Sequence, residues 1–268
     1  MSVGRALLIV ATAGAAALVV RSIVVGPVPL AAAIIAMSLY VAIAAVGAAC
    51  PCLNVYAEVA CRGSRRVPEV ALTFDGGPHP IHTAEAMDLL DAAGVKATFF
   101  VSGAKAEAYP EVTKAIVARG HDIGIRGHVV DPYLGCRSTS RIAEDLERAV
   151  NTIVSITNTR PATVRPPTIW TNGRVEAVAN RLGLAIVGCS VRGRDDSWRA
   201  CPSRVAARVR RGLRPGAIVQ LHDDFDNVHD SIRKNGRPAG VDALPSIVDA
   251  VFSQGLRCVH VIKFVQSL

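Results

Sequence analysis

Two long hydrophobic runs open the sequence, and neither contains an acidic residue. Ala6–Val20 reaches membrane-spanning length when it is extended through Arg21 to Val25, because an arginine near a helix end can direct its charge toward the headgroups. Val28–Cys50 is uncharged and about 34 Å long as a helix. A segment with one glycine and two prolines separates the runs and breaks the helix. The pattern predicts a hairpin of two membrane helices.

A signal peptide followed by a single anchor is the alternative. The first run lacks the small-x-small cleavage site that a signal peptide needs, which favours the hairpin and a bacterial-type inner membrane. The side of the membrane on which the rest of the chain lies stays open. Arg62, Arg65 and Arg66 would hold the end of the second run in the cytoplasm, whereas a signal-anchor arrangement would export the domain.

From Glu69 onward, short β-rich runs alternate with amphipathic helical ones. The expected strands are Glu69–Asp75, Lys96–Ser102, Asp122–Gly127, Thr163–Pro166, Ala185–Val191, Ala217–Asp223 and Leu256–Phe264. The expected helices are Thr83–Ala93, Glu107–Arg119, Ser140–Thr157, Asn172–Leu182, Ser203–Arg211 and Ala243–Gln254. This alternation predicts an α/β fold, a distorted (β/α)7-type barrel with a parallel sheet. We divide the chain into membrane segments at 1–52, a basic linker at 53–68 and a barrel domain at 69–268.

Titratable residues end or follow five of the expected strands. They are Asp75, the segment 126–128, Arg165, Asp195 and His222. Each has an ordinary structural explanation, such as a helix cap for Asp75 or a surface ion pair for Arg165. Together they indicate a site, because barrels of this class carry their chemistry at the carboxyl ends of the strands.

Composition narrows the class of protein. Aromatic residues make up only 4%, so the core must rest on alanine, valine, leucine and isoleucine. The net charge of +8 comes without a basic block or a DNA-binding motif, which argues against a nucleic-acid partner. Seven cysteines without a repeated spacing argue against a disulfide-stapled fold and zinc ribbons, and favour a reducing compartment.

The strand ends, in this order, resemble those of the polysaccharide deacetylases, carbohydrate esterase family 4, with its NodB homology domain. The resemblance runs from about Glu69 to Leu268 and rests on TFDGGP at 73–78, ATFFV at 97–101, GHDIG at 120–124, RPP at 165–167, the region up to Asp195, and LHD at 221–223. It implies hydrolysis of the C–N amide bond of an N-acetylated glycan or lipid-linked sugar. In the family a divalent metal such as zinc binds the amide oxygen and a water.

Carried over residue by residue, the resemblance implies roles for four side chains. Asp75 matches the general base and His222 the general acid, while Arg165 matches the arginine that orients the base. Asp195 matches the carboxylate that keeps the acid histidine protonated. Pro166, Pro167 and Trp170, in and after the third motif, are the expected substrate-binding residues.

The sequence departs from the family at all three metal-ligand positions. They are occupied by Gly76, Arg126 and Val130, none of which offers a metal-ligating side chain. His128, between two of these positions, is the possible substitute ligand. We expect no tightly bound cofactor. We expect the Arg126 guanidinium either to point into the vacated space toward Asp75 or to turn out to solvent. Restoring all three ligands is expected to raise both zinc content and deacetylation if the remaining residues are still placed for chemistry.

Two functions follow from this pattern. One is a membrane-anchored deacetylase-like hydrolase, and the other is a catalytically impaired pseudoenzyme that binds carbohydrate without metal-dependent turnover. A third alternative is an anchored barrel with no sugar site. The expected partners are an N-acetylated carbohydrate or lipid-linked sugar and membrane lipid, and no nucleic acid.

Overall fold

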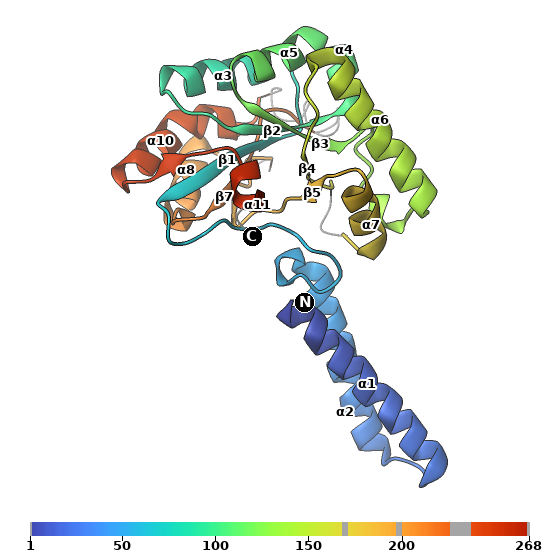
Figure 1. Ribbon diagram of the computed structural model, residues 1–268. Helices are drawn as coiled ribbons and strands as arrows, with labels where there is room; N and C mark the ends of the chain where they lie inside the picture. Colours follow the sequence, from blue (N-terminus) through green and yellow to red (C-terminus); the bar gives the residue numbers. More distant parts are fainter. Residues whose placement is uncertain (1, 168–170, 197–199, 226–236, 267–268) are drawn as a thin grey trace.

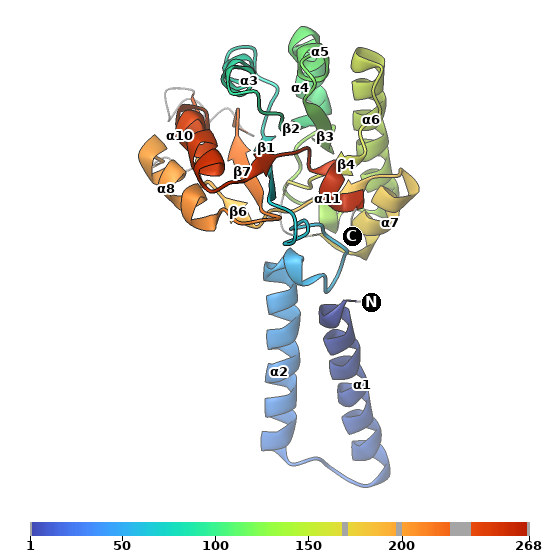
Figure 2. The same cartoon turned by 60° about the vertical axis from the view of Figure 1, so that its left-hand side comes forward.

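A computed structural model describes residues 2–167, 171–196, 200–225 and 237–266. The N-terminal hairpin consists of α1 (Val3–Val24) and α2 (Leu30–Ala49), which extend together away from the rest of the chain (Figures 1 and 2). Both helices are long and apolar enough to cross a membrane. No side chain of α1 is buried, and Gly47 is the only buried residue of α2. Such uniformly apolar, exposed surfaces suit lipid better than water.

Among the described residues, the hairpin contacts the rest of the chain at the start of α1 and the end of α2. Arg5 forms an ion pair with Glu176 at 2.6 Å, and the hydroxyl of Tyr56 donates to the carbonyl of Ala44 at 3.0 Å. Val55 packs so closely on Gly4 and Gly47 that a Cβ at either glycine would lie within 3 Å of it. The expected separation between hairpin and barrel is therefore seen along most of both helices.

The barrel is an incompletely closed parallel sheet, as expected. Its strands run in the order β5-β4-β3-β2-β1-β7-β6, with β8 paired to the start of β1. The bounds are β1 Glu69–Asp75, β2 Thr98–Ser102, β3 Asp122–Gly127, β4 Thr163–Val164, β5 Ala185–Ile186, β6 Val191–Arg192, β7 Ile218–His222 and β8 Arg257–Cys258. All seven residues of β1 are buried, which is typical of a central parallel strand with both faces covered.

Helices surround this sheet (Figure 2). Two short 3₁₀ helices, η1 and η2, lie in the connections. The bounds are η1 Pro51–Leu53, α3 His82–Ala92, α4 Gly103–Ala108, α5 Pro110–Ala118, η2 Leu134–Cys136, α6 Thr139–Thr157, α7 Gly173–Arg181, α8 Pro202–Gly212, α10 Ala239–Ser253 and α11 Ile262–Gln266. Side-chain caps fix several starts; Asn172, for example, accepts from the backbone N–H groups of Arg174 and Val175 and so starts α7.

Three expected elements were wrong in their extent. The helix at Glu107–Arg119 is two helices, because Pro110 cannot continue α4 and instead begins α5. The strand at Ala185–Val191 is two separate two-residue strands on opposite edges of the sheet. The strand at Leu256–Phe264 is only β8, and α11 follows it.

The linker between hairpin and barrel covers the gap between the two edge strands. Ala60 bridges to Val187 after β5, and Arg62 bridges to Ala217 before β7. A disulfide joins Cys52 to Cys61 within this linker. The sequence analysis did not foresee this bond, because one local pair needs neither an even cysteine count nor a repeated spacing. Disulfides persist in oxidising compartments, so this bond also removes the argument for a reducing one.

Small aliphatic side chains and a few aromatic ones build the core. Phe74 of β1 and Phe99 of β2 stack with ring centroids 4.9 Å apart, and neither ring has any exposed surface. Because aromatic residues are scarce in this chain, each large ring fills space that no neighbour can easily reoccupy.

We expect Phe99→Ala to lower the free energy of unfolding of the barrel by about 3–5 kcal/mol, since it leaves a cavity in the core. Phe252→Ala is the matched control, because that side chain is 51% exposed, and it should cost far less. Denaturant unfolding of the full chain in detergent, followed by near-ultraviolet circular dichroism, measures both. Equal losses would contradict this description of the core.

Candidate active site

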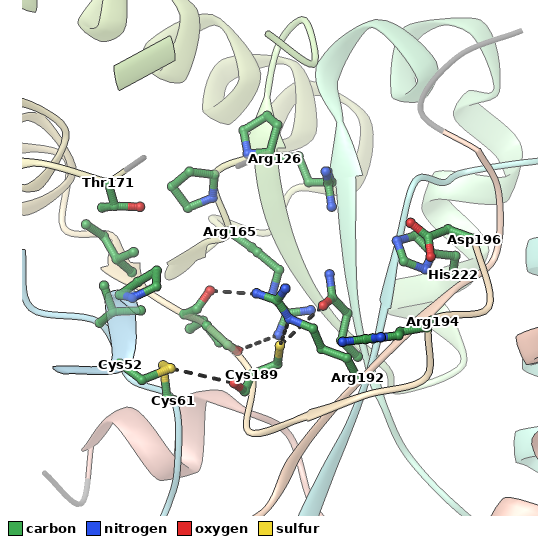
Figure 3. A pocket seen from close by; sticks show the side chains of 18 residues that line it. Cys52, Cys61, Arg126, Arg165, Thr171, Cys189, Arg192, Arg194, Asp196 and His222 are labelled. Carbon is green, nitrogen blue, oxygen red and sulfur yellow. Dashed lines mark hydrogen bonds between the residues drawn. A yellow bond between two sulfur atoms is a disulfide. The ribbon is translucent and has the colours of Figure 1, made fainter. Parts of the chain in front are cut away.

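The carboxyl ends of the strands meet at one cavity. Asp75 and His222 end the neighbouring strands β1 and β7 and are register partners, while Arg126 comes from β3. Arg165 follows β4, and Asp195 follows β6. The cavity has a volume of about 440 Å³, and Arg126, Arg165 and His222 line it (Figure 3). The structure thus brings the expected strand-end residues together, while their catalytic roles stay a prediction.

Asp75 lies at the centre of this arrangement with no exposed surface. Its Oδ2 accepts from Nη1 of Arg126 at 2.7 Å and from Nε2 of Gln220 at 2.7 Å, while its Oδ1 accepts from Nη1 of Arg165 at 2.8 Å. The guanidinium of Arg126 therefore points inward to Asp75, the first of the two orientations that the sequence left open. Both carboxylate oxygens are held by this chain's own side chains.

The charges around Asp75 keep it ionised. Burial alone would raise the pKa of this carboxyl, but the guanidiniums of Arg165 and Arg126, and then the charge of His222, hold its pKa below the ordinary value. A carboxylate with a lowered pKa and two guanidinium partners is a weak proton acceptor.

Arg165 is fixed more rigidly than an ion pair alone would require. Its guanidinium lies 4.1 Å from the centroid of the Phe100 ring and also donates to Thr73 Oγ1 at 2.7 Å and to the carbonyl of Gly188 at 2.9 Å. Asp75 and Thr73 are two residues apart on β1, so both side chains point into the barrel. The strand therefore presents two partners to one arginine.

His222 and Asp195 form the second pair of the site. Nδ1 of His222 lies 2.9 Å from Oδ1 of Asp195, and the backbone N–H of His222 donates to Oδ2 at 2.7 Å. Burial alone would lower the pKa of His222, but the charge and hydrogen bond of Asp195 outweigh it and raise that pKa to about 9. The imidazole is therefore protonated at neutral pH, as a proton donor to a leaving amine must be.

The side chains present do not fit the metal that the family resemblance implies. Gly76 has φ +97°, and a Cβ there would lie 2.1 Å from the carbonyl oxygen of Asp224. The ammonium of Lys105 fills the space beside it and donates to the Gly76 carbonyl and Asp224 Oδ2 at 2.5 Å each, and to the Phe225 carbonyl at 2.8 Å. Val130 lines a different cavity from Arg126. Two side-chain cations, Lys105 and Arg126, stand where ligands would be needed.

His128 does not take the place of the missing ligands. It lies in the second cavity beside Val130, and its Nε2 is 3.9 Å from Glu107 Oε2. Within the described ranges, potential ligand atoms converge only in two groups, His79 with His82 and Asp224, and Asp195 with Asp196 and His222. In the first group Asp224 already binds Lys105, and in the second Asp195 already binds His222.

Two of the three expected substrate-binding residues lie among the described residues. Pro166 and Pro167 line the cavity. Trp170 lies outside the described residues. That these residues bind substrate stays a prediction.

Sequence reasoning missed Gln220, Lys105, Arg192 and Arg194. Gln220 is two residues before His222 on β7, so strand alternation places both side chains on the face that lines the barrel. Gln220 could therefore have been predicted from the sequence. Arg192 and Arg194 lie in the same strand-end segment as Asp195, but the sequence analysis assigned a role only to Asp195. The role of Lys105 could not be predicted from the sequence, because its contacts depend on the conformation of the loop after β7.

We expect NMR of histidine-labelled protein to show His222 titrating near pH 9. Because this folded pKa exceeds the ordinary 6.5, the pair stabilises the fold fully below pH 6.5 and loses that stabilisation as the pH rises to about 9. In Asp195→Asn the pKa should fall toward 6.5 or lower. His121, whose pKa burial lowers to about 4, is the internal control and should not move. An unchanged His222 in Asp195→Asn would contradict the assignment.

Comparisons with known proteins identify relatives of this chain. A family model described as polysaccharide deacetylase matches residues 62–187. A chitooligosaccharide deacetylase of Sinorhizobium fredii is 33% identical over 202 residues, which cover 72% of this chain and 90% of that protein. The peptidoglycan-N-acetylglucosamine deacetylase PgdA of Listeria monocytogenes is 35% identical over 155 residues, which cover 58% of this chain and 32% of PgdA.

Solved structures have the same fold. The peptidoglycan N-acetylglucosamine deacetylase Bc1960 aligns with a TM-score of 0.71 and 26% identity over 80% of this chain and 94% of that one. BA3943 of Bacillus anthracis, described as a CE4 family pseudoenzyme, aligns with a TM-score of 0.68 and 22% identity over 77% of this chain and 68% of that one. The similarity to the Sinorhizobium protein over nine-tenths of its length, with the family model, shows that this chain belongs to the polysaccharide deacetylase family.

Proposed function

We propose that the protein is a membrane-anchored member of its family that binds an N-acetylated glycan or glycolipid without metal-dependent turnover. The main support for this proposal is that both carboxylate oxygens of Asp75 accept hydrogen bonds from side chains, namely those of Arg126, Arg165 and Gln220. The family uses a divalent metal such as zinc to activate water. Without that metal, the pKa of the attacking water stays near 15.7 rather than about 7, and a carboxylate with a lowered pKa cannot close that gap.

The sugar specificity is inferred from the named relatives. A chitooligosaccharide deacetylase and a peptidoglycan-N-acetylglucosamine deacetylase both act on N-acetylated sugars, as their names state. The cavity of this chain keeps polar groups suited to hydrogen-bonding an acetamido sugar, among them Thr171, Gln220 and His222. Pro166 and Pro167 add an apolar wall on which a sugar ring can pack.

The two apolar helices and the disulfide support a location for this binding. A hairpin of membrane helices would hold the barrel at the bilayer surface. The Cys52–Cys61 disulfide favours the oxidising, extracytoplasmic side of the membrane. This agrees with a ligand derived from the cell envelope rather than from the cytoplasm.

Slow amide hydrolysis without metal is a second candidate, favoured by the intact His222–Asp195 pair. A protonated imidazole with a pKa of about 9 can still donate a proton to a leaving amine. In this version Gln220 or Arg126 would have to release Asp75 when substrate binds, so that the carboxylate could accept a proton from water.

We expect the full chain in nanodiscs to bind chitotetraose in calorimetry while releasing no acetate above the background of the Asp75→Asn variant. Zinc, measured by elemental analysis after dialysis, should stay well below one per chain. Asp88→Asn, which changes an exposed carboxylate on α3, is the matched control and should bind as the unaltered chain does. Acetate release that disappears only in Asp75→Asn would establish the hydrolase instead, and absence of chitotetraose binding would reject both candidates.

Restoring the three family ligands should not create a zinc site in this chain. In Gly76→Asp with Arg126→His and Val130→His, the new carboxylate meets the Asp224 carbonyl and a backbone conformation that favours glycine, so we expect lower stability and little added zinc. This proposal differs from the expectation drawn from sequence, because the surroundings of position 76 oppose a carboxylate even though Asp75, Arg165, Asp195 and His222 lie together. The double variant without Gly76→Asp separates the two effects, since it should lack zinc but avoid the clash. Stoichiometric zinc in the triple variant would contradict this reading of Gly76.

A further inference from the structure

The cavity at the strand ends carries more positive charge than an uncharged sugar requires. Four arginines line it, Arg126, Arg165, Arg192 and Arg194, beside the protonated His222. The carboxylates at the same place are Asp75, Asp195 and Asp196. Among the described residues of this site, five positive groups and three negative groups give a surplus of two positive charges.

Arg192 and Arg194 account for this surplus. Arg126 and Arg165 form ion pairs with Asp75. No carboxylate in the described ranges pairs with Arg192 or Arg194. Both side chains are exposed, and both line the cavity (Figure 3). Two like charges held together repel each other, so an anion bound between them would be stabilised by both.

The backbone holds these two arginines in place. The Arg208 guanidinium of α8 donates at 2.5 Å to the carbonyl of Gly193, the residue between them. Arg194 adopts φ +54°, in the left-handed region that non-glycine residues seldom occupy. Nε of Arg192 donates to Cys189 Sγ at 3.4 Å, and Cys189 in turn contacts Gln220, which binds Asp75. The arginine pair is therefore connected to the centre of the site.

The cavity also lies next to the membrane hairpin. Pro51 and Cys52, which line it, follow directly on α2. Sγ of Cys52 lies 3.7 Å from the carbonyl of Cys189, so the linker forms one wall of the cavity beside the arginine pair. A headgroup attached to a lipid in the same membrane would reach this wall without leaving the bilayer surface.

We propose that the ligand is an N-acetylated sugar that carries a phosphate, with the phosphate bound by Arg192 and Arg194 and the sugar by the Asp75–His222 end of the cavity. This inference rests on the proposed function, because it assigns the substrate class of the same site. Guanidinium groups bind phosphate through paired, charge-assisted hydrogen bonds, and two of them define a site for one phosphate group. A phosphate-linked glycolipid and a soluble sugar phosphate share this chemistry.

Calorimetry on the full chain in nanodiscs tests the proposal with four probes. They are N-acetylglucosamine 1-phosphate, N-acetylglucosamine, inorganic phosphate, and undecaprenyl-phosphate-linked N-acetylglucosamine incorporated in the nanodisc. We expect the sugar phosphate to bind at least about tenfold more tightly than the neutral sugar, which corresponds to one charge-assisted interaction. Added salt should weaken the phosphorylated probes and leave the neutral sugar unchanged.

The variant Arg192→Ala with Arg194→Ala should remove this preference, so that the sugar phosphate and the neutral sugar bind with affinities within about twofold of each other. Arg210→Ala with Arg211→Ala is the matched control, because it removes two exposed arginines from α8 away from the cavity and changes the net charge equally. Thermal unfolding of both variants checks that the fold is kept.

The outcomes separate the possible failures. Tighter binding of the lipid-linked probe identifies a glycolipid, and equal binding of the two phosphorylated probes identifies a soluble sugar phosphate; both support the proposal. Equal affinity for phosphorylated and neutral sugar overturns it while leaving the proposed function intact. Arginine-dependent binding of inorganic phosphate to which the sugar adds nothing overturns both.

Discussion

The centre of the barrel depends on keeping one buried negative charge paired. Asp75 has no contact with solvent, and an unpaired carboxylate there would cost several kcal/mol. A metal ion beside this position would supply the balancing charge, and here Arg126 and Arg165 supply it instead. Because their side chains come from β3 and from the end of β4, the ion pairs join three strands at their carboxyl ends. The two guanidiniums therefore balance the buried carboxylate with charges that belong to the chain itself.

The contacts around Gly76 and Lys105 also leave no room for a carboxylate at position 76. Where the family has a second aspartate, Gly76 lets the Asp224 backbone approach to a distance that excludes a Cβ. The space next to it holds the Lys105 ammonium, which the Gly76 carbonyl and the Asp224 carboxylate bind. A carboxylate at position 76 would compete for this ammonium and clash with this backbone. The space beside Gly76 is thus filled by hydrogen-bonded side-chain and backbone groups of this chain.

The sequence predicted the long elements and the strand-end residues better than the edges of the sheet. The bounds of β1 and β3 match the expected ones, because each is a continuous buried run, the first ending at a glycine-proline loop. The two-residue strands β4, β5 and β6 carry too little pattern to be delimited, since tertiary pairing rather than propensity defines them. Asp75, Arg165 and His222 were found by their position after a strand. Gln220 was missed because it lies inside a strand and looked like part of the framework, and the disulfide was missed because spacing does not reveal pairing.

The linker connects the N-terminal hairpin directly to the site, because linker residues line the cavity. The linker between α2 and β1 is long enough to be flexible. The disulfide and the bridges to Val187 and Ala217 hold it against the open edge of the barrel. Its first residues then form a wall of the cavity, and Arg5 of α1 adds an ion pair to α7. With the hairpin in a bilayer, these contacts would fix the distance between the cavity and the headgroups. An arginine-lined cavity at that distance selects anionic ligands near the surface, because charge attraction in a partly enclosed site is strongest over the last few ångströms.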